Sequence, residues 1–418
     1  MKCAARTKTD FCATLACGWR GPPRINCLVH KNPPQTNAMP KIRIPAVPVL
    51  HSHRLPIRPQ HQGRHASTAV FFPGQASSES PGMLTPLLHH FPAVARAGLD
   101  AVAEALDNDP DLPTIVRLLT TTTRDDADDR LMRTTSIAQP CILLCSLLTW
   151  QVLRDHKPAA GITHPGETVF LGHSLGQITA FAAAGTIPLV DALRIVRKRG
   201  LAMEAATAAA DIDDNDNRFG MVAVPIKSNT TIADLLACAR QMRQTGKLGP
   251  DDVVDVANLN SPSQVVLSGH VAALDKLVAE LGLRKTTKLP ARIPFHSRLL
   301  RPVESRMRGA VDEAKVVMPP PAACRFLRNS DAHDLTTAHD IRESIVSGCW
   351  EQVDWVRSVR RAHDEYGVRH WLGVGPASAV TAALVRRCLD SSSSVTAYDP
   401  TKTGGAWDAF VVAAAAAE

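Results

Sequence analysis

The feature that most constrains the fold of this chain is the stretch GHSLG, Gly172–Gly176, which lies between the apolar run TVFL and the run QITAFAAAGTI. The first run is typical of a buried strand and the second of a helix. A G-x-S-x-G pattern at such a junction predicts a sharp strand-to-helix turn, the nucleophile elbow. Glycine is expected at both ends of the pattern because the chain passes too close to itself there for a Cβ atom.

This turn would make Ser174 available for chemistry. It lifts the serine Oγ above the end of the strand, and the following helix supplies N–H groups and the positive end of its dipole. The backbone N–H of Leu175 would then face an oxyanion that develops beside the serine. The motif is short, so by itself it leaves two interpretations open: a nucleophile, or a small residue in a tight turn.

Strand and helix patterns alternate along most of the chain after residue 65. TAVFF, ETVFLGHS and YGVRHWLGV are strand-like, and SIAQPCILLCSLLTWQVLRDH and LVDALRIVRKRGLAMEAA are helical runs. This alternation predicts an α/β fold with a hydrolase-like large domain on a mostly parallel sheet. We assign residues 66–218 and 294–418 to that domain.

Residues 219–293 follow a different order. GMVAVPI, VVDVANLNS, SQVVLSG and RKTTKLPA are strand-like, and helical runs follow the first and the third of them. The order β-α-β-β-α-β predicts a ferredoxin-like small domain inserted into the large one.

Three acidic, polar stretches are expected to be loops: NDPDLPT, TTTRDDADDR and DIDDNDN. The last has several potential calcium ligands, but it lacks the glycine and the terminal glutamate of an EF-hand loop, so we interpret it as a solvated linker. The ten cysteines form no CxxC pair, which argues against a metal site and favours free thiols. No uninterrupted apolar run approaches the ~18–20 residues of a membrane span.

The first 65 residues, the leader, differ in charge from the rest of the chain. They hold eleven Lys or Arg residues and one acidic residue, Asp10, whereas the remainder has 36 basic and 39 acidic residues. An Arg-rich, acid-poor leader predicts a mitochondrial transit segment and a matrix location, although prolines interrupt any amphipathic helix. Met39 is an alternative start, and a disordered basic tail without an address is the competing interpretation.

A serine nucleophile needs a base, and His296 is the strongest candidate. It lies in ARIPFHSRLL, between apolar residues, where the predicted small domain returns to the large one. Domain junctions are common places for a cleft. Most other histidines lie in the leader or in polar surroundings, where a surface role is expected.

A set of short segments then points to one family. FFPGQ, AQPCILL, GHSLG, VRKRG, ANLNSPSQVVLSGH, PFHSRLL and GVGP occur in this order. Together they resemble the malonyl-CoA:acyl-carrier-protein transacylases, and the mitochondrial type of eukaryotes is the expected branch. The resemblance covers about residues 68 to 390, and it implies the same fold and activity.

The resemblance also implies roles for the catalytic groups. Ser174 would carry the malonyl group as an ester, and His296 would act as general base and acid. Gln75 and the backbone N–H of Leu175 would form the oxyanion hole. Arg199, in VRKRG, would bind the malonyl carboxylate, for which a guanidinium fork is well suited.

Three further residues complete the implied substrate site. Gln139 and His173 would contribute to the pocket, and Phe295 matches a malonyl-type pocket because its ring leaves little room for a branching methyl group. On the helix that carries Arg199, the other cations are expected on a solvated face: Arg194, Arg197 and Lys198.

The chain departs from the family pattern in two places. In SGCWEQVDW, Gly348 replaces the usual glutamine and Gln352 replaces a proline. In the family a main-chain carbonyl near this glutamine orients the histidine, and a carbonyl survives such changes. FPGQ is followed by ASSES instead of GSQ, which affects the mouth of the site.

The implied reaction transfers malonyl from malonyl-CoA to acyl carrier protein, with no cofactor, metal or nucleic acid and as a monomer. Because carrier proteins are acidic, a basic docking surface is expected, with candidates Arg298, Arg301, Arg306 and Arg308. A hydrolase with the same elbow and a non-catalytic scaffold are the alternatives, and Arg199 and the Ser174–His296 pair count against them. Polyketide synthesis and other acyl-CoA substrates stay open.

Overall fold

The computed structural model describes residues 68–75, 80–156, 168–208, 218–226, 231–318 and 324–415. The leader, the acidic stretch 211–217 and most of ASSES lie outside the described residues, so the predictions for them stay predictions. Residues from Gln62 onward form one compact unit.

A five-stranded sheet carries the elbow. Its strands pair in parallel in the order β10-β9-β1-β2-β7, which confirms the mostly parallel sheet predicted from the sequence. The strands are β1 (Thr68–Phe72), β2 (Thr168–Gly172), β7 (Cys324–Phe326), β9 (His370–Val374) and β10 (Ser394–Tyr398). Phe72 pairs with Gly172, so the carboxyl ends of β1 and β2 lie side by side.

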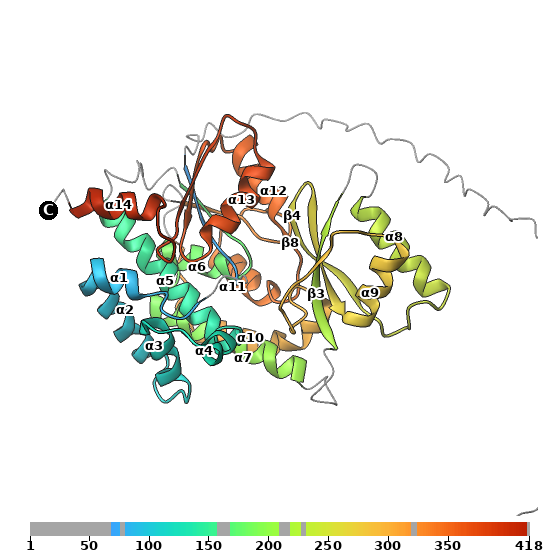
Figure 1. The fold of residues 1–418 in the computed structure, drawn as a ribbon, viewed down its shortest axis with the longest axis horizontal. Helices are drawn as coiled ribbons and strands as arrows, with labels where there is room; N and C mark the ends of the chain where they lie inside the picture. The colour runs from blue at the N-terminus through green and yellow to red at the C-terminus, as the bar shows by residue number, and fades with distance from the viewer. Residues whose placement is uncertain are drawn as a thin grey trace, which may run out of the picture. The chain divides into compact units, whose positions relative to one another are not determined.

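Both faces of this sheet are buried. Along β1, Val70 and Phe72 belong to one apolar cluster, whereas Ala69 and Phe71 belong to another. Successive side chains of a strand point to opposite faces, so a strand covered on both sides is apolar throughout. Helices α5 (Thr135–Asp155), α6 (Leu175–Ala183), α13 (Ser378–Cys388) and α14 (Ala406–Ala415) contact the strands of this sheet. The other helices of this part of the chain are α1 (Thr85–His90), α2 (Pro92–Ala105), α3 (Leu112–Thr120), α4 (Asp126–Leu131), α7 (Leu189–Ala208), α10 (Glu304–Asp312), α11 (Ala338–Ser347) and α12 (Trp355–Asp364) (Figure 1).

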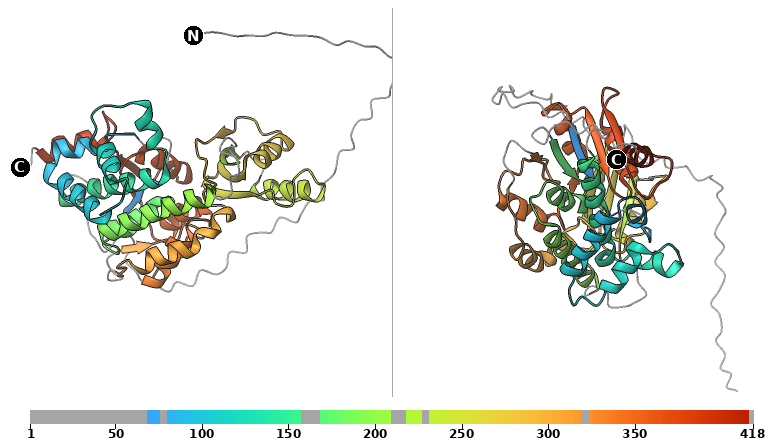
Figure 2. Two further views of the ribbon diagram at one scale, coloured as in Figure 1. Left: turned by 90° about the horizontal axis from the view of Figure 1, so that it is seen from below. Right: turned by 90° about the vertical axis from the view of Figure 1, so that its left-hand side faces the viewer.

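Helices α5 and α7 pack against each other and against α6, the helix that begins at the elbow. Among the described residues, α5 alone is long and apolar enough to cross a membrane, and 94% of its most apolar window is buried in the protein. A helix that is apolar on all sides is typical of a protein core. Helix α7 packs closely on it, because a Cβ atom at Gly200 would lie 2.3 Å from the Ser136 Cα. Helix α10 packs alongside α7, as the green and orange helices in the left view of Figure 2 show.

A second five-stranded sheet has the order β6-β3-β5-β4-β8. Strands β3 (Phe219–Pro225), β4 (Val254–Ser261), β5 (Gln264–His270) and β6 (Thr287–Lys288) have antiparallel neighbours. Helices α8 (Ile232–Gln244) and α9 (Val271–Glu280) lie on one face of this sheet (Figure 1). The order of elements matches the pattern read from residues 219–293.

One strand of the second sheet comes from outside that segment. Strand β8 (Val353–Asp354) pairs in parallel with β4, although residues 294–418 were expected to belong wholly to the large domain. The edge of β4 has unpaired backbone groups, and β8 satisfies part of them. The returning chain is thereby joined to both sheets.

The loop prediction for TTTRDDADDR was wrong, because its second half begins α4. The Asp125 side chain accepts a hydrogen bond from the Asp128 N–H at 2.7 Å, and further acidic residues occupy the first turn. Both features stabilise a helix N-terminus. The end of NDPDLPT likewise starts α3, with Pro113 in its first turn. Polar composition therefore concealed two helix starts.

Candidate active site

Ser174 occupies a strained turn between β2 and α6. Its φ and ψ angles are 54° and −113°, a conformation that costs about 1–3 kcal/mol for a residue with a side chain. A Cβ atom at Gly172 would lie 1.9 Å from the Gly176 carbonyl carbon, and one at Gly176 would lie 2.2 Å from the Phe72 oxygen. Both glycines are therefore required by close backbone contacts, as the motif predicts.

Asn329 holds the two sides of this turn together. Its Oδ1 accepts a hydrogen bond from the Ser174 N–H at 2.9 Å, and its Nδ2 donates to the Gly172 carbonyl at 2.8 Å. The residue lies shortly after β7, and its side chain is buried. No signal in the sequence points to Asn329, because a strand of three residues such as β7 has too little periodicity to be recognised.

His296 lies against Ser174, as predicted. Its Nε2 is 2.7 Å from the Ser174 Oγ, and its Nδ1 is 2.8 Å from the main-chain carbonyl oxygen of Glu351. A carbonyl can only accept, so Nδ1 carries the proton and Nε2 is left to accept the serine hydroxyl. The expectation of a main-chain carbonyl behind the histidine identified the right segment and the right kind of group.

The protonation state of His296 follows from its surroundings. Burial, together with the positive charge of Arg199, lowers the pKa of the imidazole from 6.5 to about 3, while the hydrogen bond to Glu351 acts in the opposite direction. The ring is therefore neutral at neutral pH. A neutral imidazole with a free Nε2 lone pair is the form that can take a proton from the serine.

Arg199 is a buried cation beside this pair. It is 3% exposed, and its Nη2 is 3.4 Å from the Gly348 carbonyl oxygen, a long hydrogen bond. No carboxylate among the described residues forms an ion pair with it. A buried guanidinium without a counter-ion is costly unless a ligand supplies the negative charge.

The prediction for Arg197 was wrong. Its side chain is buried and forms ion pairs with Asp109 at 2.8 Å and Asp111 at 2.6 Å, and it donates to the Ser136 carbonyl. These carboxylates come from the connection between α2 and α3, far away in the sequence. The two buried arginines of α7 therefore differ, since only Arg199 is left without a carboxylate partner in the described part of the chain.

Of the two predicted glutamines, Gln75 lies close to the elbow and Gln139 lies in helix α5, which packs beneath it. Gln75 follows Gly74, where a Cβ atom would lie 2.7 Å from the His173 carbonyl oxygen. Gln139 is buried in α5, one turn after Ser136, the residue that contacts Gly200. The Oε1 atoms of Gln75 and Gln139 are both buried without a hydrogen-bond partner among the described residues. Both oxygens therefore lack a donor in the described part of the chain.

His173 and Phe295 connect the elbow region with the second sheet. The His173 Nε2 is 2.9 Å from the Asn260 Oδ1, and its ring packs edge-on against Trp355. Burial lowers the pKa of His173, so the ring is neutral. Phe295 packs against both the main core and the inner apolar residues of the second sheet, among them Ala257. His173 thus has a clear structural contact in addition to its predicted substrate role.

The four arginines predicted to form a docking surface fall into two groups. Arg298 forms an ion pair with Asp255, and Arg308 forms ion pairs with Glu304 and Glu343. Arg301 and Arg306 form no ion pair with a described residue. Half of the expected surface is therefore already neutralised within the fold.

The geometry limits the chemistry that this site can perform. A serine whose proton can pass to a neutral histidine, with helix N–H groups at its side, forms and breaks acyl esters. The parallel sheet and the elbow are the setting in which such a serine occurs. The fold and the site thus define a serine enzyme of acyl transfer.

Comparison with known proteins identifies the family. The acyl transferase domain family matches residues 70–387, and this chain belongs to it as an acyltransferase. The malonyl CoA-acyl carrier protein transacylase of Salmonella typhimurium is 30% identical over 335 residues, 79% of this chain and 96% of that protein.

Two solved structures extend the comparison. The malonyl-CoA:acyl carrier protein transacylase of Xanthomonas oryzae pv. oryzae is 26% identical, with a TM-score of 0.66 over 84% of this chain and 99% of that one. A malonyl-transacylase in complex with a type II PKS acyl-carrier protein shares the fold at 23% identity, with a TM-score of 0.66 over 84% and 100% of the two chains.

Proposed function

We propose that this enzyme transfers the malonyl group of malonyl-CoA to the phosphopantetheine thiol of acyl carrier protein, for fatty-acid synthesis. The observation that carries the proposal is Arg199, a buried cation without a carboxylate partner in the described chain, beside the Ser174–His296 pair. A malonyl thioester brings both the carbonyl that the serine attacks and the carboxylate that the arginine lacks. The relatives named above act on this pair of substrates.

In the first half-reaction, the His296 Nε2 takes the proton of Ser174 as the Oγ attacks the thioester carbonyl. The imidazolium that forms keeps its Nδ1–H on the Glu351 carbonyl, which orients the ring. The oxyanion would lie between the Leu175 N–H and Gln75. The intermediate collapses as the C–S bond breaks, and the imidazolium returns the proton to the CoA thiolate.

The second half-reaction is the reverse with another thiol. His296 takes the proton of the phosphopantetheine thiol, whose sulfur attacks the malonyl-serine ester, and returns it to the Ser174 Oγ as the ester bond breaks. One thioester replaces another, so the equilibrium follows the concentrations. Arg199 would hold the malonyl carboxylate during both steps, with Gln139 beside it.

The intact mass of the protein after mixing with malonyl-CoA tests this proposal. We expect an adduct of one malonyl group that is absent in Ser174→Ala and disappears when acyl carrier protein is added. Release of free malonate without transfer would indicate a hydrolase instead. If neither an adduct nor turnover occurs with malonyl-CoA, the proposed activity is wrong.

The cellular setting and the domain division belong to the same proposal. The basic leader supports an enzyme of the mitochondrial matrix in a eukaryote. Import into mitochondria of a fluorescent protein fused to residues 1–65 would test this location. The strand order of the second sheet supports a ferredoxin-like small domain over 219–293, inserted between 66–218 and 294–418. A monomer is expected, and sedimentation measures it.

A further inference from the structure

The segment that carries His296 is held by a carboxylate of the second sheet. Asp255, in β4, accepts hydrogen bonds from the Ser297 hydroxyl at 2.8 Å and from the Arg298 backbone N–H at 3.0 Å. The Arg298 guanidinium donates to the same carboxylate, with Nη2 2.5 Å from Oδ1. One side chain therefore binds both residues that follow the catalytic histidine.

These contacts are shielded from water to different degrees. The Asp255 side chain is 19% exposed and that of Arg298 is 60% exposed. Ser297 is fully buried, so its hydroxyl needs a partner inside the protein. The exposed ion pair contributes little in comparison with the bonds to Ser297 and to the backbone.

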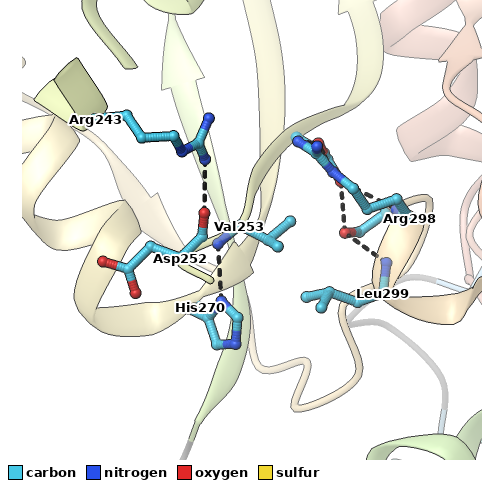
Figure 3. Close-up of polar contacts among 8 residues, drawn as sticks. Arg243, Asp252, Val253, His270, Arg298 and Leu299 are labelled. Atoms are coloured by element: carbon cyan, nitrogen blue, oxygen red, sulfur yellow. Dashed lines mark hydrogen bonds and ion pairs between the residues drawn. The ribbon is translucent and has the colours of Figure 1, made fainter. Parts of the chain in front are cut away.

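The start of β4 is itself fixed. Arg243 donates to the Asp252 carbonyl at 2.6 Å, and the Val253 N–H donates to the His270 Nδ1 at 2.9 Å (Figure 3). Two residues beyond Asp255 in the same strand, Ala257 packs in the apolar cluster that Phe295 contacts. Residues on both sides of His296 thus lie against a strand that is anchored independently of the catalytic pair.

His296 requires such support because its backbone is strained. Its φ angle is 58°, in the left-handed region that residues with side chains avoid. A small relaxation of this angle would swing the imidazole away from the Ser174 Oγ, which now lies 2.7 Å from Nε2. We infer that Asp255 is a positioning residue, which keeps His296 in hydrogen-bond contact with Ser174 by binding Ser297 and the Arg298 backbone.

This inference rests on the proposed function only in taking Ser174 as the nucleophile. A fluorophosphonate probe labels a serine that is activated by a histidine, and it needs no malonyl carboxylate. Its labelling rate on the full chain therefore reports the Ser174–His296 geometry even if the acyl substrate has been misassigned. Malonyl loading, measured in parallel, reports the proposed function.

We expect Asp255→Ala to slow labelling about 10- to 100-fold, because it removes the oxygen that accepts from both the Ser297 hydroxyl and the Arg298 N–H. Asp255→Asn should recover most of the rate, because its amide oxygen can accept both of these hydrogen bonds. Arg298→Ala should stay within about threefold of the parent, since the bonds to Ser297 and to the backbone N–H remain. Asp275→Ala is the matched control: it removes an exposed aspartate of helix α9 that pairs with Lys288, and it should leave the labelling rate unchanged.

A positioning role also predicts a change in the pH profile. In the parent His296 is neutral throughout the range of pH 6 to 8, so labelling should vary little there. If Asp255→Ala releases the ring into water, its pKa rises and labelling falls below pH 7. The inference is overturned if Asp255→Ala labels at the parent rate. It is also overturned if the variant loses rate only in proportion to the fraction unfolded, as measured by circular dichroism.

Discussion

Replacing Arg199 with alanine should change which acyl group the enzyme accepts. The guanidinium is buried, and its described hydrogen bond, to Gly348, is long. A malonyl carboxylate would form two charge-assisted hydrogen bonds with it, each worth about 1.5–3 kcal/mol. We therefore expect Arg199→Ala to lose about 3–6 kcal/mol with malonyl-CoA, or roughly 10²- to 10⁴-fold in kcat/KM.

Acetyl-CoA should respond in the opposite direction. Its neutral methyl group leaves the buried arginine of the parent enzyme unpaired, and the alanine variant removes that penalty. The assay compares kcat/KM for the two thioesters with acyl carrier protein as acceptor. Lys198→Ala is the control, because Lys198 lies on the exposed face of the helix that carries Arg199 and pairs there with Glu313. The assigned role of Arg199 in selecting malonyl is wrong if Arg199→Ala slows both substrates equally, or if the preference for malonyl-CoA persists.

Three further predictions concern the elbow and its base. Asn329→Ala leaves the Ser174 N–H and the Gly172 carbonyl unpaired, so chemical denaturation should show a loss of about 2–3 kcal/mol, with serine labelling slowed at least tenfold. Gly172→Ala places a Cβ atom 1.9 Å from a carbonyl carbon and should prevent folding or abolish labelling, whereas Gly309→Ala, in open space, should be silent. The unfolded chain protonates His296 near pH 6.5 and the folded chain only near pH 3. The unfolding free energy should therefore fall on acidification below pH 6.5, by up to about 1.4 kcal/mol per pH unit, and part of this slope should vanish in His296→Gln when urea unfolding is compared at pH 7 and 5.

The parts of this molecule that the sequence predicted are those whose physical requirements lie within a few consecutive residues. The elbow is such a case, because the strand, both glycines, the serine and the helix start are contiguous, and each is required by the same turn. The parallel sheet is another, because its strands are buried on both faces and read as continuous apolar runs. The residues around His296 were not enough to predict its role as a base, and the family resemblance supplied the remaining evidence.

The features that were missed depend on partners far away in the sequence. Arg197 looks like one of several surface cations on α7, and only the fold brings Asp109 and Asp111 to it. Asn329 approaches the elbow from a position 155 residues further along the chain. Neither periodicity nor local propensity predicts such contacts, because they arise when separate strands meet in one sheet.

The departures from the family pattern at Gly348 and Gln352 have a consistent explanation in this light. Three main-chain carbonyls of this segment bind catalytic groups: that of Glu351 binds the His296 ring, that of Cys349 accepts from the His296 N–H, and that of Gly348 binds Arg199. Side chains can change there as long as the path of the backbone is kept. Strand β8 begins at Val353, directly after these residues, and its pairing with β4 fixes that path.

The same strand β4 holds the segment after His296 through Asp255 and the elbow through Asn260. The second sheet therefore contacts both the elbow and the segment that follows His296, while Gly348 contacts the site through its main-chain carbonyl.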